Sequence, residues 1–429
     1  KKIIARAHGW SNGDQSILEN GVVIDISNIN KIISYDKVKR TIEVEAGIKL
    51  TEILLISLKD NLFLPSMPGG LDITVGGAVS NNIHGKDCFK NGYFENNVKK
   101  IKILTYEGKM IEVSKTQNKE LYEGVFSSQG LLGIIYSIEI ILEPTKSSYL
   151  EVKTKVANNI LEMESYFENM SNDSDYAVAW LDCAAKEESI MRGIFSEAKF
   201  ITNLETEKNS NNLIQKKINK FLIKREKNIK KIFFKFFWRI IGKVFGSSFF
   251  KLFNFLAFNF VKIIGLSKKK IIFPEFLFME EKYLPEYKYL FKEKGFLCIQ
   301  PFFSGEKPFE KIKDVILLCQ KYKILPIWCP IKKYKKPINE TLTFGGDGYS
   351  IVIEFSPHEI GLEKASNFVS DLENLIIAQK GKVYLAKDQI ISNNSFKQMY
   401  PNYKKFIDLK KKYDPDSVFV SEQFKRLFT

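Results

Sequence analysis

The first 145 residues alternate short apolar runs with tight turns. Residues 48–59 instead place apolar positions at a helical period. Runs rich in β-branched residues predict strands at 22–26, 40–47, 99–105, 110–113 and 136–144. We expect an α+β domain over 1–145 and not a doubly wound parallel sheet, because regular strand–helix–strand units are missing from the pattern.

The region 146–382 predicts a second domain with a different arrangement. Its first residues have the pattern typical of β-strands. A Phe-rich segment follows, and after it the sequence again predicts strands and helices. The segments 308–322 and 361–381 are amphipathic helices with strands on either side. This alternation predicts a sheet covered on one face by helices. The last segment, 383–429, is polar and helical.

The excess of positive over negative charge is confined to one insertion in this second domain. Lys plus Arg number 65 and Asp plus Glu 50, a formal net charge of +15. Between Leu213 and Lys270 the chain has sixteen Lys or Arg and only one acidic residue, Glu226. The rest of the chain has 49 basic and 49 acidic residues. A protein that wraps nucleic acid carries a more general basic coat, so we expect no nucleic-acid partner.

The insertion 213–270 predicts a membrane-surface segment. Cations recur every third or fourth position from Lys216 to Lys243, beside a parallel apolar stripe from Ile218 to Phe245. Such a helix can lie in an anionic membrane interface. Lys251 interrupts the apolar run that follows, and the ten uncharged residues 252–261 are fewer than the about 20 that a span needs. We expect surface insertion or a re-entrant hairpin; the alternative is a lid that packs on the second domain.

Five cysteines with wide spacing and no CxxC motif predict free thiols and no metal site. The opening KKIIARAHGW lacks an apolar stretch typical of a signal peptide and has no initiator Met. We therefore expect a cytoplasmic, peripherally membrane-associated protein whose N-terminus is truncated.

Three clusters of small residues in the first domain are candidate ligand loops: 5–14, 67–86 and 130–135. Consecutive backbone N–H groups in the first can converge on phosphate oxygens, and glycines in the second allow close backbone approach to a ligand. Each cluster alone is equally consistent with ordinary turns. None fits GxGxxG or the P-loop pattern, which argues against nicotinamide and P-loop nucleotide sites.

Four motifs, RAHGWSNGD, PGGLDITVGGAVSNNIHGK, GLLGII and VYLAKD, resemble those of the vanillyl-alcohol oxidase (PCMH-type) family in order and spacing. Within that family they are most similar to the flavin subunits of decaprenylphosphoryl-β-D-ribose 2′-epimerases. The resemblance implies a two-subdomain FAD-binding domain at 1–145, a substrate (cap) domain at 146–382 and a segment 383–429 that returns to the flavin. A stretch that usually precedes the first loop is missing, so the first subdomain is expected to be N-terminally incomplete.

The resemblance also implies which residues hold FAD. The position that carries a covalent His in some relatives is Trp10 here, so we expect noncovalent FAD. The implied cofactor-binding residues are Ala5, Arg6, Ala7, His8, Gly9, Trp10, Ser11, Asn12, Gly13, Asp14, Gly69, Thr74, Val75, Gly76, Gly77, Asn81, Asn82, Ile83, His84, Ile135 and Tyr384.

Lys387 is the catalytic candidate by the same resemblance. Taken alone it is one lysine among many; at a flavin, its charge can stabilise negative charge or hold a substrate hydroxyl. The implied substrate residues are Trp180, Gln300, Lys332, Ser350 and Val352. At Ser350 and Val352, and also at Asn12 and Phe278, the chain departs from the residue types that the resemblance leads us to expect, which affects substrate identity more than reaction class.

The resulting hypothesis is an FAD-dependent oxidoreductase acting on the 2-hydroxyl of a polyprenyl-phosphoryl pentose or related lipid-linked sugar. By the resemblance, a short-chain NAD(P)H-dependent reductase would be the partner that completes an epimerisation. One alternative is an FAD-dependent oxidase of a soluble sugar or aldonolactone. Another, of a different class, is a flavin-free membrane-associated scaffold.

Overall fold

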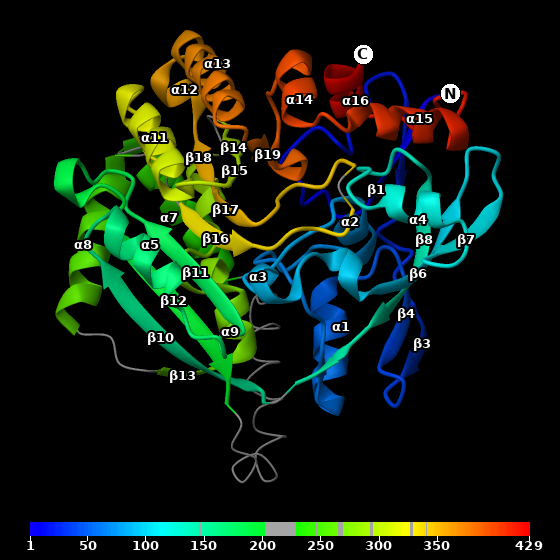
Figure 1. Ribbon diagram of the computed structural model, residues 1–429, viewed down its shortest axis with the longest axis horizontal. Helices are drawn as coiled ribbons and strands as arrows, with labels where there is room; N and C mark the ends of the chain where they lie inside the picture. Colours follow the sequence, from blue (N-terminus) through cyan, green and yellow to red (C-terminus); the bar gives the residue numbers. More distant parts are fainter. Residues whose placement is uncertain are drawn as a thin grey trace. The chain divides into compact units, whose positions relative to one another are not determined.

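The computed structural model describes residues 1–145, 147–201, 229–244, 248–264, 269–291, 295–326, 329–339 and 341–429 (Figure 1). The chain divides into two compact units. Unit 1 comprises Lys1–Thr145, Lys335–Gly346 and Lys382–Thr429, and unit 2 comprises Lys146–Tyr334 and Asp347–Gly381. Unit 2 is thus inserted, in two pieces, between segments of unit 1.

Unit 1 contains a five-stranded antiparallel sheet and a separate parallel strand pair. The sheet order is β3-β4-β8-β6-β7, with β3 Ile32–Asp36, β4 Thr41–Glu45, β6 Val98–Leu104, β7 Met110–Ser114 and β8 Ile134–Ile141. Ile42 faces Ile140 across the β4–β8 ladder, and both are fully buried. Such cross-strand pairs on one face fix the register, because a one-residue slip would expose them.

The parallel pair joins β1 (Ile3–Arg6) to β2 (Val22–Asp25). Short helices complete unit 1: α1 Leu50–Ser57, α2 Val75–Ser80, α3 Cys88–Asn91, α4 Lys119–Val125, α14 Asn393–Met399, α15 Tyr403–Tyr413 and α16 Glu422–Phe428. The side chains of Ser392 and Ser421 cap α14 and α16 by accepting a backbone N–H.

Unit 2 is built on a sheet whose strands are antiparallel to their neighbours. Seven strands follow the order β13-β10-β12-β11-β16-β17-β15. Their bounds are β10 Tyr149–Ala157, β11 Tyr176–Leu181, β12 Gly193–Phe200, β13 Lys269–Ile272, β15 Pro301–Ser304, β16 Pro330–Tyr334 and β17 Gly348–Ile351. A further antiparallel pair joins β14 (Leu297–Ile299) to β18 (Ile353–Phe355).

Helices α5 (Ile160–Glu168), α11 (Pro308–Lys321) and α13 (Leu362–Ala378) belong to the same unit. Phe167 of α5 packs edge-on against Phe195 and Tyr349 of the sheet, and Phe309 of α11 contacts the same Tyr349 ring. Helices α5 and α11 therefore pack on the same face of the sheet (Figure 1). The predicted α+β class is confirmed. On the opposite face of the sheet, Phe273 and Phe276 of α9 (Phe273–Leu277) contact the ring of Tyr176, so helices pack on both faces and not on one only.

The basic insertion forms two helices, α7 (Ile229–Val244) and α8 (Ser248–Ile264), bent by 114° with respect to each other. The part of the predicted cationic helix from Lys216 to Asn228, and Phe245 of its apolar stripe, lie outside the described residues. Among the described helices, none is by itself long and apolar enough to cross a membrane; the bent pair passes that test jointly, by length and composition.

Two further sequence predictions concern the cysteines and the domain boundaries. All five cysteines are buried, and none of them forms a disulfide bond in the structure. Residues 335–346, which the sequence assigns to the second domain, belong to unit 1 instead. The reason is that the segment contacts unit 1 directly: Glu95 accepts the backbone N–H of Ile338 at 2.7 Å, and Phe344 stacks on His84.

Candidate flavin site

The first glycine-rich loop runs from the end of β1 to Asp14 and is tied to the Tyr384–Asp388 turn. The backbone N–H of Asn12 donates to the carbonyl oxygen of Ala386 at 3.1 Å. A Cβ on Gly13 would lie 2.0 Å from the carbonyl oxygen of Asp388, so only glycine permits this approach. The two motifs, more than 370 residues apart in the chain, therefore form one structure.

A partly buried charge cluster reinforces that junction. Arg426 of α16 donates from Nη2 to Asp14 Oδ1 and to Asp388 Oδ2, each at 2.8 Å. Asp388 is completely buried, and burial raises its carboxyl pKa against the opposing effect of Arg426. The carboxylate of Asp14 is thus engaged in holding the loop, which leaves the loop's backbone for a ligand.

Arg6 places a positive charge at the first loop, and Gly9 makes room for its guanidinium. Gly9 adopts the left-handed conformation (φ +61), and a Cβ there would lie 2.6 Å from Arg6 Nη2. The guanidinium therefore lies against the turn, where it can pair with phosphate oxygens that the loop's N–H groups receive. This arrangement fits a pyrophosphate group.

The second motif surrounds α2 and meets both the first loop and the late turn. A Cβ on Gly70 would lie 3.5 Å from the Trp10 ring. The Tyr384 hydroxyl donates to the carbonyl oxygen of Asn81 at 3.1 Å. Ring centroids of His84 and Tyr384 are 4.9 Å apart. His84 is buried, and the rings of Tyr93 and Tyr384 lie against it.

Phe344 and Tyr93 complete this aromatic cluster, and sequence reasoning missed both. The Phe344 centroid lies 4.9 Å from that of Tyr384 and 5.6 Å from that of His84. Gly345 adopts φ +103, and a Cβ there would lie 1.7 Å from the Tyr93 hydroxyl. The Phe344-Gly345-Gly346 triplet was the available signal, because paired glycines beside an aromatic residue mark a close backbone approach.

Other predicted cofactor residues in this motif serve the packing of the protein. The N–H groups of Val75 and Gly76 donate to the carbonyl oxygens of Ile48 and Ala46. Asn82 is buried and accepts the backbone N–H of Glu95 at 3.1 Å. The backbone donors of Val75 and Gly76 are therefore already used, and these residues act by shaping the chain around the site.

The third motif adjoins the same elements. The backbone N–H of Gln129 donates to the carbonyl oxygen of Ser80, at the end of α2. A Cβ on Gly130 would lie 3.7 Å from the Ile4 side chain of β1. Ile135 is buried in β8, paired with Ile103 of β6. All four motifs thus converge within unit 1.

Two buried polar atoms near this convergence test whether the unit fits FAD. Asn81 Oδ1 and Gln15 Oε1 are buried and have no hydrogen-bond partner among the described residues. A buried acceptor without a donor is costly unless a ligand supplies one. The ribityl hydroxyls and ring N–H of a flavin are such donors, so the residues present fit the cofactor.

Lys387 lies in the same turn as Tyr384, within a single 3₁₀ turn (Leu385–Lys387). Its side chain is half-buried and makes no hydrogen bond or ion pair with any described residue. The neighbouring carboxylate of Asp388 is held by Arg426 and does not neutralise it. A positive charge therefore remains available on the turn that follows Tyr384.

The predicted substrate residues lie in unit 2 and share one face of its sheet. Lys332 of β16 is directly opposite Ser350 of β17, and Trp180 of β11 is opposite Pro330. Side chains two apart on a strand point the same way, so Trp180, Lys332 and Ser350 project from the same face. The N–H of Val352 donates to the carbonyl oxygen of Pro330 in the same region.

A buried polar triangle lies on this face. Gln300 Nε2 donates to the Tyr334 hydroxyl at 2.9 Å and to Ser350 Oγ at 3.0 Å, and the two hydroxyls are 2.8 Å apart. Sequence reasoning identified Gln300 and Ser350 but missed Tyr334. Its position two residues after Lys332 in an alternating strand was the signal. Phe278, by contrast, is fully buried in the helical region after β13 and contributes packing.

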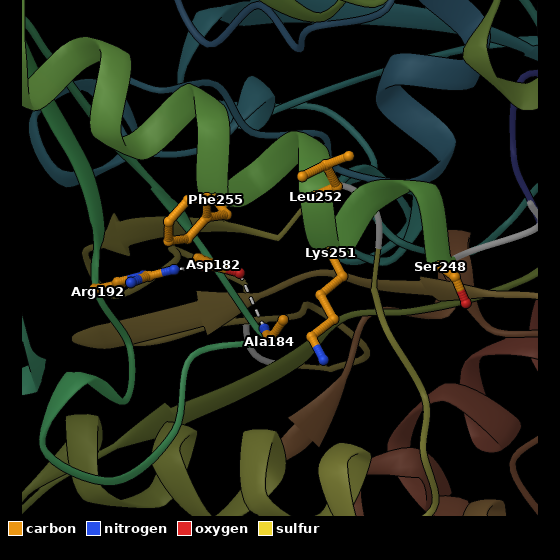
Figure 2. Close-up of a pocket in the computed structure, with 7 residues that line it drawn as sticks. All are labelled: Asp182, Ala184, Arg192, Ser248, Lys251, Leu252 and Phe255. Atoms are coloured by element: carbon orange, nitrogen blue, oxygen red, sulfur yellow. Dashed lines mark hydrogen bonds and ion pairs between the residues drawn. The ribbon is translucent and has the colours of Figure 1, made fainter.

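Unit 2 also has a separate cavity of about 320 Å³ beside α8. Figure 2 shows its lining, which includes none of the predicted site residues: Asp182, Ala184, Arg192, Ser248, Lys251, Leu252 and Phe255. Asp182 is almost fully buried and pairs with Arg192 at 2.7 Å. The cavity therefore combines a neutralised ion pair with the ammonium of Lys251 and two apolar side chains.

Comparisons with known proteins agree with this geometry. Residues 1–114 match the FAD binding domain family, and residues 301–427 match the D-arabinono-1,4-lactone oxidase family. The chain is 27% identical to the decaprenylphosphoryl-beta-D-ribose oxidase of Mycolicibacterium smegmatis, over 99% of this chain and 89% of that protein. It is 22% identical to the L-gulonolactone oxidase of Mus musculus, over 100% of this chain and 90% of that protein. Cytokinin dehydrogenase 2 of Arabidopsis thaliana matches at 28% over 40% of this chain and 34% of its own length.

Proposed function

We propose that this chain, an FAD-dependent oxidoreductase whose residues 1–114 and 301–427 match the FAD binding domain and D-arabinono-1,4-lactone oxidase families, oxidises a lipid-linked sugar. The proposed substrate is a polyprenyl-phosphoryl pentose or a related molecule, and the reacting group is its 2-hydroxyl. The observation that carries the proposal is the unpaired, half-buried Lys387 at the convergence of the four flavin motifs. A flavin-free scaffold is set aside, because the FAD binding domain and the oxidase region both match.

The proposed cofactor site assigns a role to each part of unit 1. The first loop, with Arg6, would bind the pyrophosphate, and the Asn81–His84 segment with Tyr384 would hold the flavin. Bound FAD supplies a two-electron acceptor for alcohol oxidation. We propose noncovalent binding, supported by Trp10 at the position of the tethering His.

Lys387 would act by its charge. An ammonium held without a counter-ion stabilises negative charge that develops nearby, and it can orient a substrate hydroxyl by donating a hydrogen bond.

The polar face of unit 2 supports a sugar as the substrate. The Gln300–Tyr334–Ser350 triangle presents a linked set of donors and acceptors beside the ammonium of Lys332. Such a set suits the hydroxyls of a pentose. We propose that these residues select the sugar.

In this proposal the oxidised product is a 2-keto sugar. A separate short-chain, NAD(P)H-dependent reductase would return the ketone to an alcohol with inverted stereochemistry, so that the pair of proteins performs an epimerisation. The M. smegmatis relative named as an oxidase of decaprenylphosphoryl-ribose supports this class of substrate. Mixing the two proteins with substrate should then convert one epimer to the other only when both are present.

A second candidate function is oxidation of a soluble sugar or aldonolactone. It is favoured by the match of residues 301–427 to the lactone oxidase family and by the full-length similarity to L-gulonolactone oxidase. This alternative requires no lipid. It therefore predicts equal turnover of a free sugar and its lipid-linked form.

Anaerobic bleaching of the flavin distinguishes the two candidates. Purified protein with bound FAD is mixed, without oxygen, with polyprenyl-phosphoryl pentoses, the matching free pentoses and aldonolactones, and the flavin absorbance is followed. We expect rapid bleaching by a lipid-linked pentose and slow or no bleaching by the others. Bleaching by an aldonolactone alone would overturn the proposal in favour of the second candidate.

A further inference from the structure

The two helices of the insertion form a hairpin whose outer side is apolar, and we propose that it docks unit 2 onto an anionic lipid bilayer. The hairpin consists of α7 and α8, residues 229–244 and 248–264. The proposal concerns the lipid surface itself and holds whether or not the substrate is lipid-linked. It is argued from the packing, exposure, charge and length of the two helices.

The inner side of the hairpin is fixed to unit 2. Trp238 is buried, and its Nε1–H donates to the carbonyl oxygen of Pro285 at 2.8 Å. A Cβ on Gly242 would lie 2.2 Å from the carbonyl oxygen of Leu290, so α7 packs directly against the Tyr287–Phe291 turn. On α8, the ring of the buried Phe258 lies 4.8 Å from the Arg192 guanidinium. The hairpin is therefore a built part of unit 2 and not a loose tether.

The outer side exposes an unusual concentration of large apolar side chains. Of 23 exposed large hydrophobic residues in the described part of the chain, eleven belong to these two helices. Five are on α7 and six on α8: Ile232, Phe233, Phe236, Ile240, Val244, Leu252, Phe255, Leu256, Phe260, Ile263 and Ile264. So many exposed large apolar side chains on two neighbouring helices favour a docking face.

The positive charge of the two helices favours anionic lipid as the partner of that face. Their 33 residues include seven Lys or Arg and no Asp or Glu. Lys235, Arg239 and Lys243 recur at every fourth position and so form a line along α7 beside its apolar face. Cations that flank an apolar stripe fit an interface in which acyl chains lie next to anionic headgroups. A protein partner that is apolar and uniformly acidic would be needed to offer the same complementarity.

The hairpin is suited to lie in the interface and not to span the bilayer. At about 1.5 Å per residue, helices of 16 and 17 residues are each shorter than the about 30 Å hydrocarbon core. The sharp bend between them also prevents a straight crossing. Because one side of each helix is buried in protein, only the outer side is available to lipid.

Lys251 adds a candidate headgroup contact. Figure 2 shows its side chain extending from α8 over the cavity, with Leu252 and Phe255 on the same helix. Lys251 makes no ion pair with a described residue. With Phe255 in the acyl region, its ammonium would meet the phosphate of a lipid headgroup.

The test is vesicle flotation of the full chain with bound FAD. Vesicles of phosphatidylcholine are compared with vesicles that also contain phosphatidylglycerol. The double variant Phe236→Glu/Phe260→Glu places two charges on the outer face, and Leu161→Glu/Leu362→Glu is the matched control at exposed positions of α5 and α13. We expect strong binding to the anionic vesicles, at least about a hundredfold weaker for the double variant and unchanged for the control.

Lys251→Glu tests the electrostatic part. It should weaken binding to the anionic vesicles and leave any binding to pure phosphatidylcholine unchanged. Melting temperature and flavin absorbance establish that each variant is folded. Equal flotation of the double variant and the unaltered protein would overturn the proposal. So would failure of the unaltered protein to bind vesicles, including the case in which it self-associates and the double variant is monomeric, because a second copy would then cover the face.

Discussion

Several glycines of the predicted flavin motifs are needed for close packing within the protein itself. Gly13 lies so close to the Asp388 carbonyl oxygen that a Cβ would not fit, and a Cβ on Gly76 would lie only 2.9 Å from Ala46 Cβ. Lys387 is different, because the described structure gives its ammonium no partner. Among the predicted residues it is therefore the one whose removal should change chemistry more than structure.

We expect Lys387→Ala to retain FAD and to lose substrate-dependent flavin reduction by about a hundredfold or more, a magnitude typical of a lost electrostatic contact to developing charge. Stopped-flow absorbance under anaerobic conditions measures the reduction rate. Lys405→Ala, at an exposed position of α15, is the control and should reduce at the normal rate. If Lys387→Ala reduces as fast as the unaltered enzyme, Lys387 has no catalytic role.

At this scale the motifs predicted that distant segments lie together, but not what each residue in them does. The motifs predicted His84, Tyr384 and Lys387 to lie together, and they lie in one cluster or on one turn. Spacing could not show that Val75 and Asn82 bond to protein groups, since those partners are distant in the chain. Tyr334 was missed for the same reason: its value depends on Gln300, 34 residues away.

Among the elements, α16 illustrates how a distant helix can control a binding loop. Arg426 on this helix holds both Asp14 of the first loop and the fully buried Asp388. Removing one partner of a buried pair leaves the other charge uncompensated. The loop and the late turn would then lose their common anchor.

We expect Arg426→Ala to lower the free energy of unfolding by about 3 kcal/mol near neutral pH. Burial raises the folded-state pKa of Asp388, so its contribution to stability is present at low pH and is lost as pH rises through that pKa. Without Arg426 the pKa rises further, so the loss should be larger near pH 8 than near pH 5. Urea unfolding at the two pH values measures this.

The neighbouring Lys425 provides the control, since it forms an exposed pair with Glu422 on the same helix. Lys425→Ala should change stability by less than about 1 kcal/mol at either pH. A loss for Arg426→Ala that is the same at both pH values would contradict the assignment of the effect to Asp388.

Most helices and strands followed from local pattern, whereas one connecting segment did not. The predicted strand at 99–105 is β6, Val98–Leu104, and the predicted helix at 308–322 is α11, Pro308–Lys321. Residues 335–346 were assigned to the wrong unit because their anchor, Glu95, lies 243 positions earlier. No periodicity in the segment itself can reveal such a long-range hydrogen bond.

For the whole molecule, the cofactor should act as a structural component of unit 1. FAD that binds only the folded state stabilises it in proportion to the logarithm of its concentration over Kd, by about 2.7 kcal/mol at a hundredfold excess over Kd. We expect added FAD to raise the melting temperature of the apoprotein in a concentration-dependent way, as followed by scanning fluorimetry.

Noncovalent binding makes a second prediction at this scale. Precipitation of the holoprotein with acid should release the yellow flavin into the supernatant and leave a colourless pellet, since denaturation removes every noncovalent contact. Flavin that stays with the pellet would show a covalent link and contradict the prediction from Trp10.

The junction between Asp14 and Arg426 also constrains how the protein is made. These residues are 412 positions apart, and the ribosome synthesises the whole of unit 2 between them. The first loop therefore waits, without its anchor, until α16 has emerged. Unit 2 has all its strands available earlier and can fold first. Cofactor loading should thus be a post-translational event, and nascent chains stalled before α16 should fail to retain FAD.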